Sequence, residues 1–170
     1  MTIIYIVLSA IVVFVVVLYL FGKKPYIHKN IQFNDLEKYF AVLLKRGHNG
    51  GFMIVQLQKR TELFVQFSKY IFKTDERGLQ SGFPVTEWSK PYYEGFLKCA
   101  QVMGLSYSET STSTNDPENR AKSFVTLDFG RDITTAREFT ARVFQDVYGA
   151  KEDDTVRLYY GNVDARDREI

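Results

Sequence analysis

Apolar residues are distributed very unevenly along this chain of 170 residues. Residues 2–21 read TIIYIVLSAIVVFVVVLYLF and contain no charged side chain. A helix of that length rises about 30 Å, at about 1.5 Å per residue, which matches the hydrocarbon layer of a bilayer. Tyr5 and Tyr19 stand near the two ends of the run, where aromatic residues meet lipid headgroups. The pattern predicts a transmembrane helix from Thr2 to Phe21.

A cleaved signal peptide is the competing interpretation of this run. No basic residue precedes Ile3, the run is longer than the usual apolar region of a signal, and no small-x-small cleavage site follows it. We therefore expect an uncleaved anchor. Because Lys23, Lys24 and Lys29 all follow the run, the positive-inside rule predicts a single-pass protein of the inner or plasma membrane with a cytoplasmic domain.

Beyond the run, the apolar positions recur in short amphipathic segments of a single domain of roughly 145 residues. Residues 1–22 are predicted to be the anchor, and residues 23–32 a juxtamembrane linker in which Pro25 ends the helix. Residues 33–163 are predicted to form the soluble α+β domain, and residues 164–170 a flexible tail.

Three segments have the spacing of amphipathic helices. They run from Asn34 to Gly47, from Ser89 to Gly104 and from Asp132 to Gly149. Asn34 has capping-box spacing to Glu37, Ser89 precedes Pro91 as an N-cap, Asp132 is another natural N-cap, and Gly149 is a C-cap. The apolar stripes that should face the core are Leu36, Tyr39, Phe40, Leu43 and Leu44; Tyr93, Phe96, Leu97, Ala100 and Met103; and Ala136, Phe139, Val143, Phe144 and Val147.

Five segments have strand composition. They are residues 52–58, 61–72, 78–88, 123–130 and 155–163. The first two should form a hairpin after a turn at residues 48–51, where Asn49-Gly50 favours positive φ. Pro84 should confine the third strand to an edge of the sheet or make it an irregular piece. The polar residues 106–119 are predicted to be a mobile loop.

In the second strand of that hairpin, apolar residues alternate with residues that are partly aromatic and partly polar. Leu63, Val65, Phe67 and Ile71 share one face, interrupted only by Lys69, whereas Phe64, Gln66, Ser68 and Tyr70 share the other. One face should be buried and the other partly wet. The element order α-β-β-β-α-β-α-β predicts a two-layer α+β domain, with an antiparallel sheet and the helices largely on one side.

Charge and composition narrow the function classes. The 22 basic and 20 acidic residues nearly cancel, so the domain lacks the basic field of a nucleic-acid-binding protein. Cys99 is the only cysteine, which excludes an intramolecular disulfide, and it should be a small buried residue of a helix. His28 and His48 fall in connectors without metal-ligand spacing, and we expect both to be solvated.

No set of residues with catalytic spacing is present. The D-F-G at residues 128–130 lacks the other motifs of a kinase. Asp128 and Asp132 could pair in a hydrolase, but Asp132 is better explained as a helix cap and Asp128 should point away from the core. The cluster of Gly47, Gly50 and Gly51 follows a helix and should be a turn, not a phosphate-binding loop. We therefore predict no catalytic residue, no cofactor and no metal.

Aromatic residues make up 15% of the chain, and several lie outside the predicted core stripes. Exposed aromatic residues with few charges indicate a partner-binding surface, although they can also complete the core of a two-layer domain. These aromatic residues are Phe64, Tyr70, Tyr92, Tyr107, Tyr159 and Tyr160. The predicted partner-binding residues are Phe64, Gln66, Tyr70, Tyr92, Tyr159 and Tyr160.

Two segments carry a family resemblance. FVQF at residues 64–67 and VTLDFGRDITTAREFTARVFQDVYG at residues 125–149 resemble the type III secretion chaperone-like fold, including the putative bacterial sensory-transduction regulator family and the TY-Chap domains. The resemblance implies binding of peptides or proteins by a non-catalytic sheet surface, usually in dimers. The membrane anchor, the polar stretch at residues 106–119 and the additional C-terminal strand depart from that pattern.

These observations favour a bacterial, single-pass, membrane-anchored and non-catalytic protein-interaction module, either chaperone-like or an adaptor. Its expected partners are the lipid bilayer, through Thr2 to Phe21, and another protein or a second copy, but not nucleic acid. A membrane-bound toxin-immunity protein is the alternative, since such a protein would also be small, carry one membrane anchor and need no catalytic residues. A hydrolase using Asp128 and Asp132 is the third hypothesis.

Overall fold

The structure is a computed structural model, and it describes residues 26–72, 76–111 and 123–164. The predicted membrane span from Thr2 to Phe21 lies outside these residues, as does the predicted tail after residue 164. Within the described ranges, no helix is long and apolar enough to cross a membrane.

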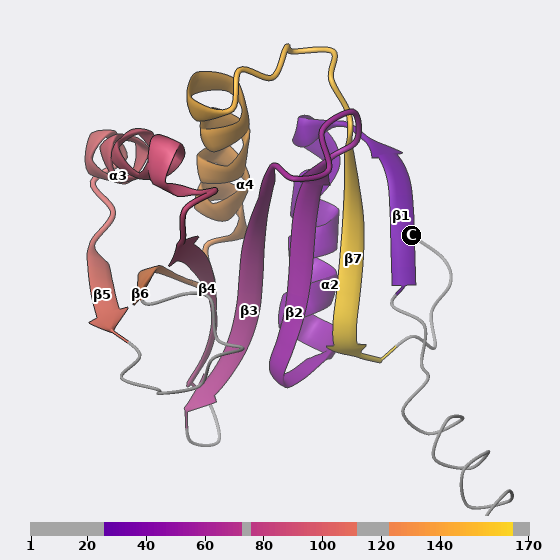
Figure 1. Cartoon of the computed structure of the whole chain (residues 1–170). Helices are drawn as coiled ribbons and strands as arrows, with labels where there is room; N and C mark the ends of the chain where they lie inside the picture. Colours follow the sequence, from indigo (N-terminus) through magenta and orange to yellow (C-terminus); the bar gives the residue numbers. More distant parts are fainter. Residues whose placement is uncertain (1–25, 73–75, 112–122, 165–170) are drawn as a thin grey trace, which may run out of the picture.

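The described residues form one antiparallel sheet and three α-helices (Figure 1). The strands are β1 (Tyr26–Ile31), β2 (Gly47–Leu57), β3 (Phe64–Phe72), β4 (Glu76–Val85), β5 (Tyr107–Ser111), β6 (Ser123–Gly130) and β7 (Val156–Val163). The helices are α2 (Leu36–Arg46), α3 (Tyr93–Val102) and α4 (Ile133–Arg142). Short 3-10 turns, η1 (Phe33–Asp35) and η2 (Lys90–Tyr92), precede α2 and α3, and a π-helical turn, η3 (Val143–Val147), continues α4.

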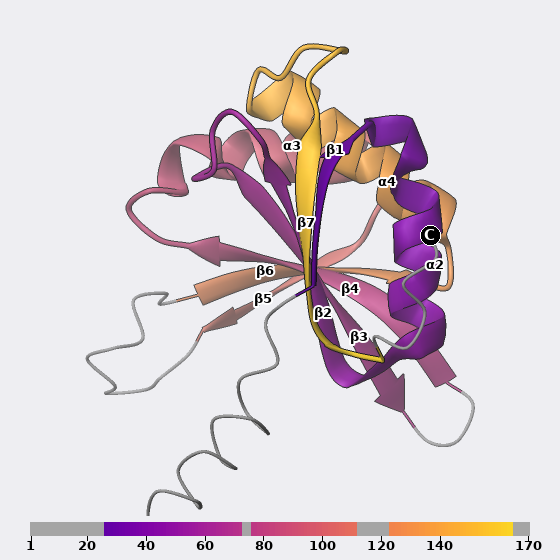
Figure 2. The same cartoon turned by 90° about the vertical axis from the view of Figure 1, so that its right-hand side faces the viewer.

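The sheet has seven strands in the order β1-β7-β2-β3-β4-β6-β5. The three described helices lie together on one side of it (Figure 2). The α+β class, the antiparallel sheet and the placement of the helices on one side are therefore as the sequence predicts. The C-terminal strand β7 does not lie at an edge of the sheet, because it pairs with β1 on one side and with β2 on the other.

Alternation along the strands builds the core between the sheet and the helices. In β2 the buried apolar side chains are those of Met53, Val55 and Leu57, and the residues between them are half-buried. The predicted helix stripes supply the other layer, where Phe40, Phe96 and Phe139 are fully enclosed. Burying side chains of this size is the main stabilising contribution to such a two-layer domain.

Lys69 lies inside this core with 3% of its surface exposed. Its ammonium group donates to the carbonyl oxygen of Gly47 at 2.5 Å, directly after the last residue of α2. A cation is stabilised there because the C-terminal carbonyls of a helix carry partial negative charge. Burial lowers the pKa of Lys69. Lys69 therefore fixes the end of α2 against β3 instead of interrupting the core.

The structure corrects the sequence-based interpretation at both edges of the sheet. The predicted linker at residues 23–32 contains β1, and the predicted mobile loop at residues 106–119 begins with β5, its remainder from residue 112 lying outside the described residues. Each of these strands pairs with a single neighbour. An edge strand can be short and polar because only one of its sides is bonded, so its composition resembles that of a loop.

Pro84 does not place its strand at an edge, since β4 pairs with β3 on one side and with β6 on the other. The pairing with β3 ends at Gly82 opposite Gln66, whereas the pairing with β6 continues through Pro84 to Val85. Proline is tolerated at this position because only one neighbour remains there.

Three local signals also need correction. Asn34 does not cap α2, because its first turn is the 3-10 turn η1 and no side-chain cap is formed. Residues 48–51 belong to β2, where a shift of register between Gly47 and Phe52 forms a bulge and Gly50 has a φ of 74°. Ser89 is in the N-cap position of η2, but its hydroxyl donates to the carbonyl of Pro84 instead.

The signals around α4 are confirmed. Asp132 accepts a hydrogen bond from the Thr135 amide at 2.9 Å and so caps the helix. Gly149 follows the π-helical turn with a φ of 67°, as a glycine at a helix end commonly does.

Candidate functional site

The side of the sheet opposite the helices, here called the open face, is not covered by any described helix (Figure 2). The cross-strand register brings residues of four neighbouring strands together at its centre. They are Tyr159 on β7, Phe52 and Ile54 on β2, Phe64, Gln66 and Ser68 on β3, and Gln80 and Gly82 on β4. None of these residues is Lys, Arg, Asp or Glu. The centre of the open face is thus apolar and amide-rich, and it is half-exposed.

Two aromatic rings of the open face lie flat across neighbouring glycines. A Cβ atom added to Gly161 would collide with the ring of Phe52, and a Cβ atom added to Gly78 would collide with the ring of Tyr70. Phe52 pairs with Gly161 and Tyr70 pairs with Gly78 in the register of the sheet. At these two positions a larger residue would have to displace the neighbouring ring.

Gly82 is different, because no described heavy atom lies within 4 Å of the position where its Cβ would stand. Its φ is not in the left-handed region, so the backbone does not require glycine either. Glycine inside a strand weakens the strand, and it often marks a place where another backbone or a ligand approaches closely. The space above Gly82, between its strand partners Gln66 and Thr126, contains no described atom, and this open space is here called the hollow.

An aromatic pair and two charged residues border this centre. Phe64 packs against Trp88 with ring centroids 5.1 Å apart, and Trp88 remains 38% exposed. Arg157 lies at one corner, where it donates to the Tyr159 hydroxyl and to the Gln58 carbonyl. Asp128 lies toward the opposite corner and accepts a hydrogen bond from the Tyr70 hydroxyl at 2.8 Å. Burial, together with this bond, raises the pKa of Tyr70 to about 12, so the phenol stays protonated at neutral pH.

Four of the six predicted partner-binding residues meet on the open face: Phe64, Gln66, Tyr70 and Tyr159. The other two do not. Tyr160 belongs to the core with 4% of its surface exposed, and its hydroxyl donates to the Tyr39 carbonyl at 2.8 Å. Tyr92 packs edge-on against Tyr148 beside the helices. Placing Tyr160 outside the core was wrong, because it follows Val156 and Leu158 on the buried side of β7.

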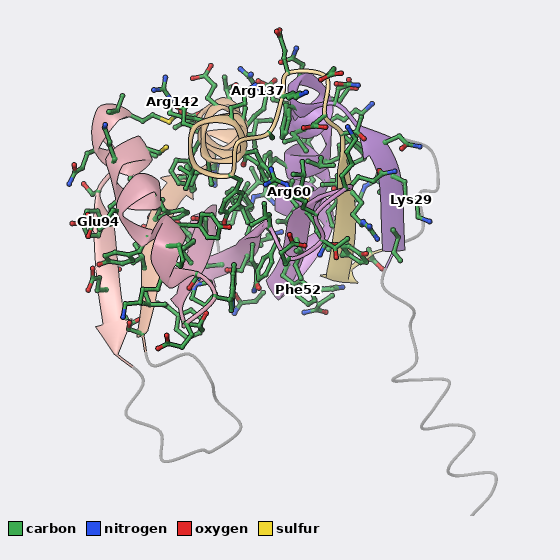
Figure 3. The ribbon with its side chains drawn as sticks, turned by 45° about the horizontal axis from the view of Figure 1, so that its top comes forward. Lys29, Phe52, Arg60, Glu94, Arg137 and Arg142 are labelled. Atoms are coloured by element: carbon green, nitrogen blue, oxygen red, sulfur yellow. The ribbon has the colours of Figure 1, made fainter. Side chains whose placement is uncertain are left out.

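The sequence interpretation missed Phe52, Ile54, Trp88 and Gly82. Phe52 and Ile54 alternate with the buried Met53 and Val55. The two-residue period of a strand therefore predicts that Phe52 and Ile54 lie on the open face. No comparable signal exists for Gly82, because its hollow depends on the packing of the whole sheet. In Figure 3, Phe52 lies well below Arg137 and Arg142, which stand near the top of the view on the helical side.

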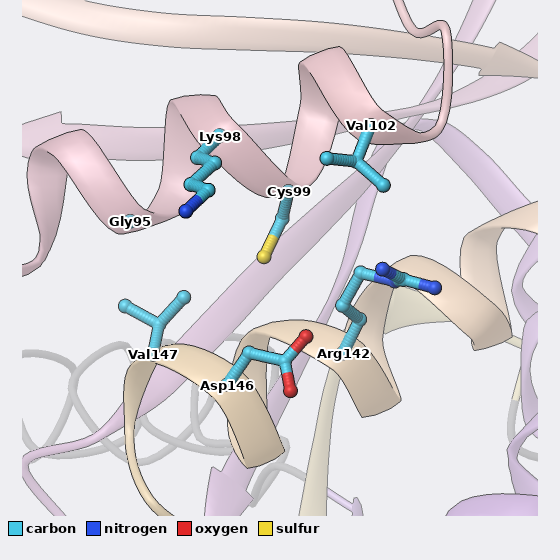
Figure 4. Close-up of a pocket in the computed structure, with 7 residues that line it drawn as sticks. All are labelled: Gly95, Lys98, Cys99, Val102, Arg142, Asp146 and Val147. Carbon is cyan, nitrogen blue, oxygen red and sulfur yellow. The ribbon is translucent and has the colours of Figure 1, made fainter.

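A pocket of about 250 Å³ lies on the helical side, between α3 and the end of α4 (Figure 4). The Cys99 thiol points toward Asp146 and Arg142 across it. Burial, and to a lesser degree Asp146, raises the pKa of Cys99, so the thiol is protonated and is a weak nucleophile at neutral pH. The prediction that Cys99 is a buried helix residue is confirmed.

The two candidate carboxylates have separate partners. Asp128 bonds with Tyr70 and the Gly130 amide, whereas Asp132 caps α4. The backbone and side-chain hydrogen bonds from Thr135 lower the pKa of Asp132. This arrangement gives each carboxylate a structural role and does not build an acid–base pair.

The two histidines also lie elsewhere than the sequence suggested. His28 is not solvated in a linker: it is half-buried in β1, and its ring contacts Tyr39 and Tyr160. His48 is exposed, but in β2. Among the residues that the structure describes, no group of three His, Cys, Asp or Glu side chains could hold a metal ion.

Comparison of the chain with protein-family models, with curated proteins and with solved structures gave no match.

Proposed function

We propose that this chain is a membrane-anchored, non-catalytic interaction module whose open face binds an uncharged, aromatic- or aliphatic-rich segment of another protein. The observation that carries the proposal is the composition of the open face around Gly82. There Phe52, Ile54, Phe64 and Tyr159 offer apolar surface beside a hollow that the fold itself does not require.

The chemistry of the partner follows from the charges. A Lys or Glu side chain of a partner would lose its water at the centre of this face, where no residue carries a charge, and this loss is costly. Gln66 and Gln80 can instead bond with backbone or amide groups of a neutral segment. The half-exposed aromatic residues add apolar area at low entropic cost, as aromatic residues at interfaces commonly do.

The anchor part of the proposal rests on the uncharged run from Thr2 to Phe21. The lysines that follow this run favour a cytoplasmic domain in a bacterial inner or plasma membrane. A tethered module does not need high affinity for a partner in the same membrane, because tethering raises the effective concentration of each toward the other.

Site-specific photo-crosslinking of the full-length chain in its native host tests the proposal. A photoreactive phenylalanine derivative is placed at Gln66, which is exposed on the open face, and at Gln145 as the matched control, which is exposed on the helical side. The expected result is a protein adduct at position 66 but not at position 145, with the attachment site in a segment free of charged residues.

A second variant ties the adduct to the apolar surface. Phe64→Glu places a charge beside position 66 and should reduce the adduct at least tenfold, because the segment would have to bury an unpaired carboxylate. Equal adduct yields at both positions, or an attachment site rich in Lys or Glu, would contradict the proposal.

A further inference from the structure

The two edges of the sheet, β1 and β5, differ in how well they could pair with another strand. They stand at opposite ends of the molecule (Figure 1). In the part of the chain that the structure describes, neither has a strand on its outer side. An unpaired edge presents a row of backbone donors and acceptors, which proteins either protect or use for binding.

The β1 edge is protected. Its register against β7 shifts between His28 and Ile31, and Asn30 has a φ of 58°. The Asn30 amide donates to the Gln58 side chain at 2.9 Å, and the Gln58 side chain donates back to the Asn30 side chain at 2.7 Å. Lys29 is exposed on this edge (Figure 3). A bulge and a lysine are two of the devices that prevent edge-to-edge pairing.

The β5 edge has neither a bulge nor a lysine. From Tyr107 to Ser111 every residue pairs with β6 in continuous register, without a bulge. The strand contains no Pro, Gly or Lys, and it has no residue with positive φ. Tyr107, Ser108, Glu109 and Thr110 are all exposed. The outer backbone groups of β5 are therefore arranged regularly enough to accept a further strand.

Acidic side chains determine which strand would fit. Glu109 accepts a hydrogen bond from the Tyr93 hydroxyl of α3. This bond is the largest cause that raises the pKa of Tyr93 to about 12, and Glu94 also contributes. Glu94 lies on α3 above this edge (Figure 3). The Glu109 carboxylate is thus held by the Tyr93 hydroxyl on the helical side of β5.

A second copy of the chain fits this edge poorly. Antiparallel pairing of two β5 strands about their central residue would place Glu109 opposite Glu109, and like charges directly opposite each other destabilise a strand pair. A strand with Lys or Arg at that position would gain a favourable cross-strand pair instead.

We propose that the outer edge of β5 binds an extended segment of another protein that carries Lys or Arg opposite Glu109. Backbone hydrogen bonds provide most of the attraction, and the carboxylate selects the charge of the partner. This site does not depend on the open face, because it uses the edge of the sheet at the far end of the strand order.

Two short fluorescent peptides of alternating threonine and valine, one with lysine at its centre and one with glutamate, provide the test. Their binding to the full-length chain in zwitterionic lipid nanodiscs is measured by fluorescence anisotropy. We expect the lysine peptide to bind about fivefold more tightly, since one cross-strand charge pair has about that effect. Glu109→Lys should reverse the preference, and Glu109→Gln should abolish it.

Two controls locate the binding site. Lys29→Glu, on the protected β1 edge, and Phe64→Glu, on the open face, should leave both affinities unchanged. The proposal would be overturned if neither peptide binds. It would also be overturned if the preference for the lysine peptide is the same in Glu109→Lys and Glu109→Gln as in the unsubstituted chain. If Glu109→Lys prevents folding, as judged by circular dichroism, the loss of preference in the nearly isosteric Glu109→Gln decides the question. If the lysine peptide no longer binds to Phe64→Glu, the peptide binds to the open face, and this result would also overturn the proposal.

Discussion

The two faces of this sheet are formed by alternate residues of the same strands, but they differ in how far their side chains are buried. On the helical face, Val65 and Phe67 of β3 are enclosed, and even Lys69 is buried with its ammonium group bonded to the end of α2. On the open face, Phe64 and Gln66 remain half-buried or exposed, and Gly82 leaves a hollow. The side chains of the helical face are enclosed as in a protein core. The open face retains apolar surface that the fold does not use.

The largest expected difference between the faces is in stability. Phe67 is fully buried and contacts the rings of Phe40 and Phe129, so Phe67→Ala should lower the free energy of unfolding by about 3–5 kcal/mol. Phe64→Ala on the open face should cost less than half of that, because its ring already meets water. Urea titration of the full-length chain in detergent measures both values. Equal losses would show that the open face is part of the core.

The adjacent Tyr159 and Tyr160 provide a smaller and closely matched comparison. Tyr160→Phe removes the hydrogen bond to the Tyr39 carbonyl and should cost about 0.5–1.5 kcal/mol. Tyr159→Phe on the open face should change the free energy of unfolding by less than about 0.5 kcal/mol. Urea titration at neutral pH measures both variants, and a larger loss for Tyr159 would reverse the assignment of the two faces.

The buried tyrosines also predict a pH dependence. Burial raises the pKa of Tyr160 and that of Tyr148 above the value of about 10 for a free phenol. The folded state therefore keeps protons that the unfolded chain loses, so this contribution to stability is complete below about pH 10 and falls as the pH rises further. Tyr160→Phe should make the decline between about pH 10 and pH 11 less steep. A decline that is unchanged in this variant would mean that Tyr160 is not buried.

The smallest expected effects distinguish the glycines of the open face. Gly161→Ala forces the Phe52 ring aside and should cost about 1 kcal/mol. Gly82→Ala meets no described atom and should increase stability by about 0.5–1 kcal/mol, since alanine loses less backbone entropy than glycine on folding. Thermal unfolding followed by circular dichroism measures both shifts. A loss of stability in Gly82→Ala would show that the hollow is filled within the protein itself.

Much of this fold can be predicted from local patterns. The stripes of α2, α3 and α4 follow from their 3.6-residue spacing, and the β2–β3 hairpin follows from two alternating segments around Lys59 and Arg60. The edge strands β1 and β5 could not be predicted in this way, because a strand with one neighbour needs few apolar residues. The position of β7 between β1 and β2 depends on contacts between residues more than a hundred positions apart.

The candidate site shows the same limit. Phe64, Gln66 and Tyr70 were assigned to one face because their alternation with Leu63 and Val65 is unambiguous. In β7 the two tyrosines are adjacent, so only the phase set by Val156 and Leu158 shows that Tyr160 is inside. The hollow at Gly82 depends on the pairing of β4 with both β3 and β6, and no local pattern contains it.

The central claim is that Gly82 is kept free for a partner and not for the fold. The most direct test is Gly82→Val in the full-length chain, with the crosslinker at Gln66. The account predicts a thermal unfolding midpoint equal to or above that of the unsubstituted chain, because valine favours a strand and has room there. It also predicts an adduct yield reduced about tenfold or more. An unchanged adduct yield in a stably folded Gly82→Val chain would contradict the account.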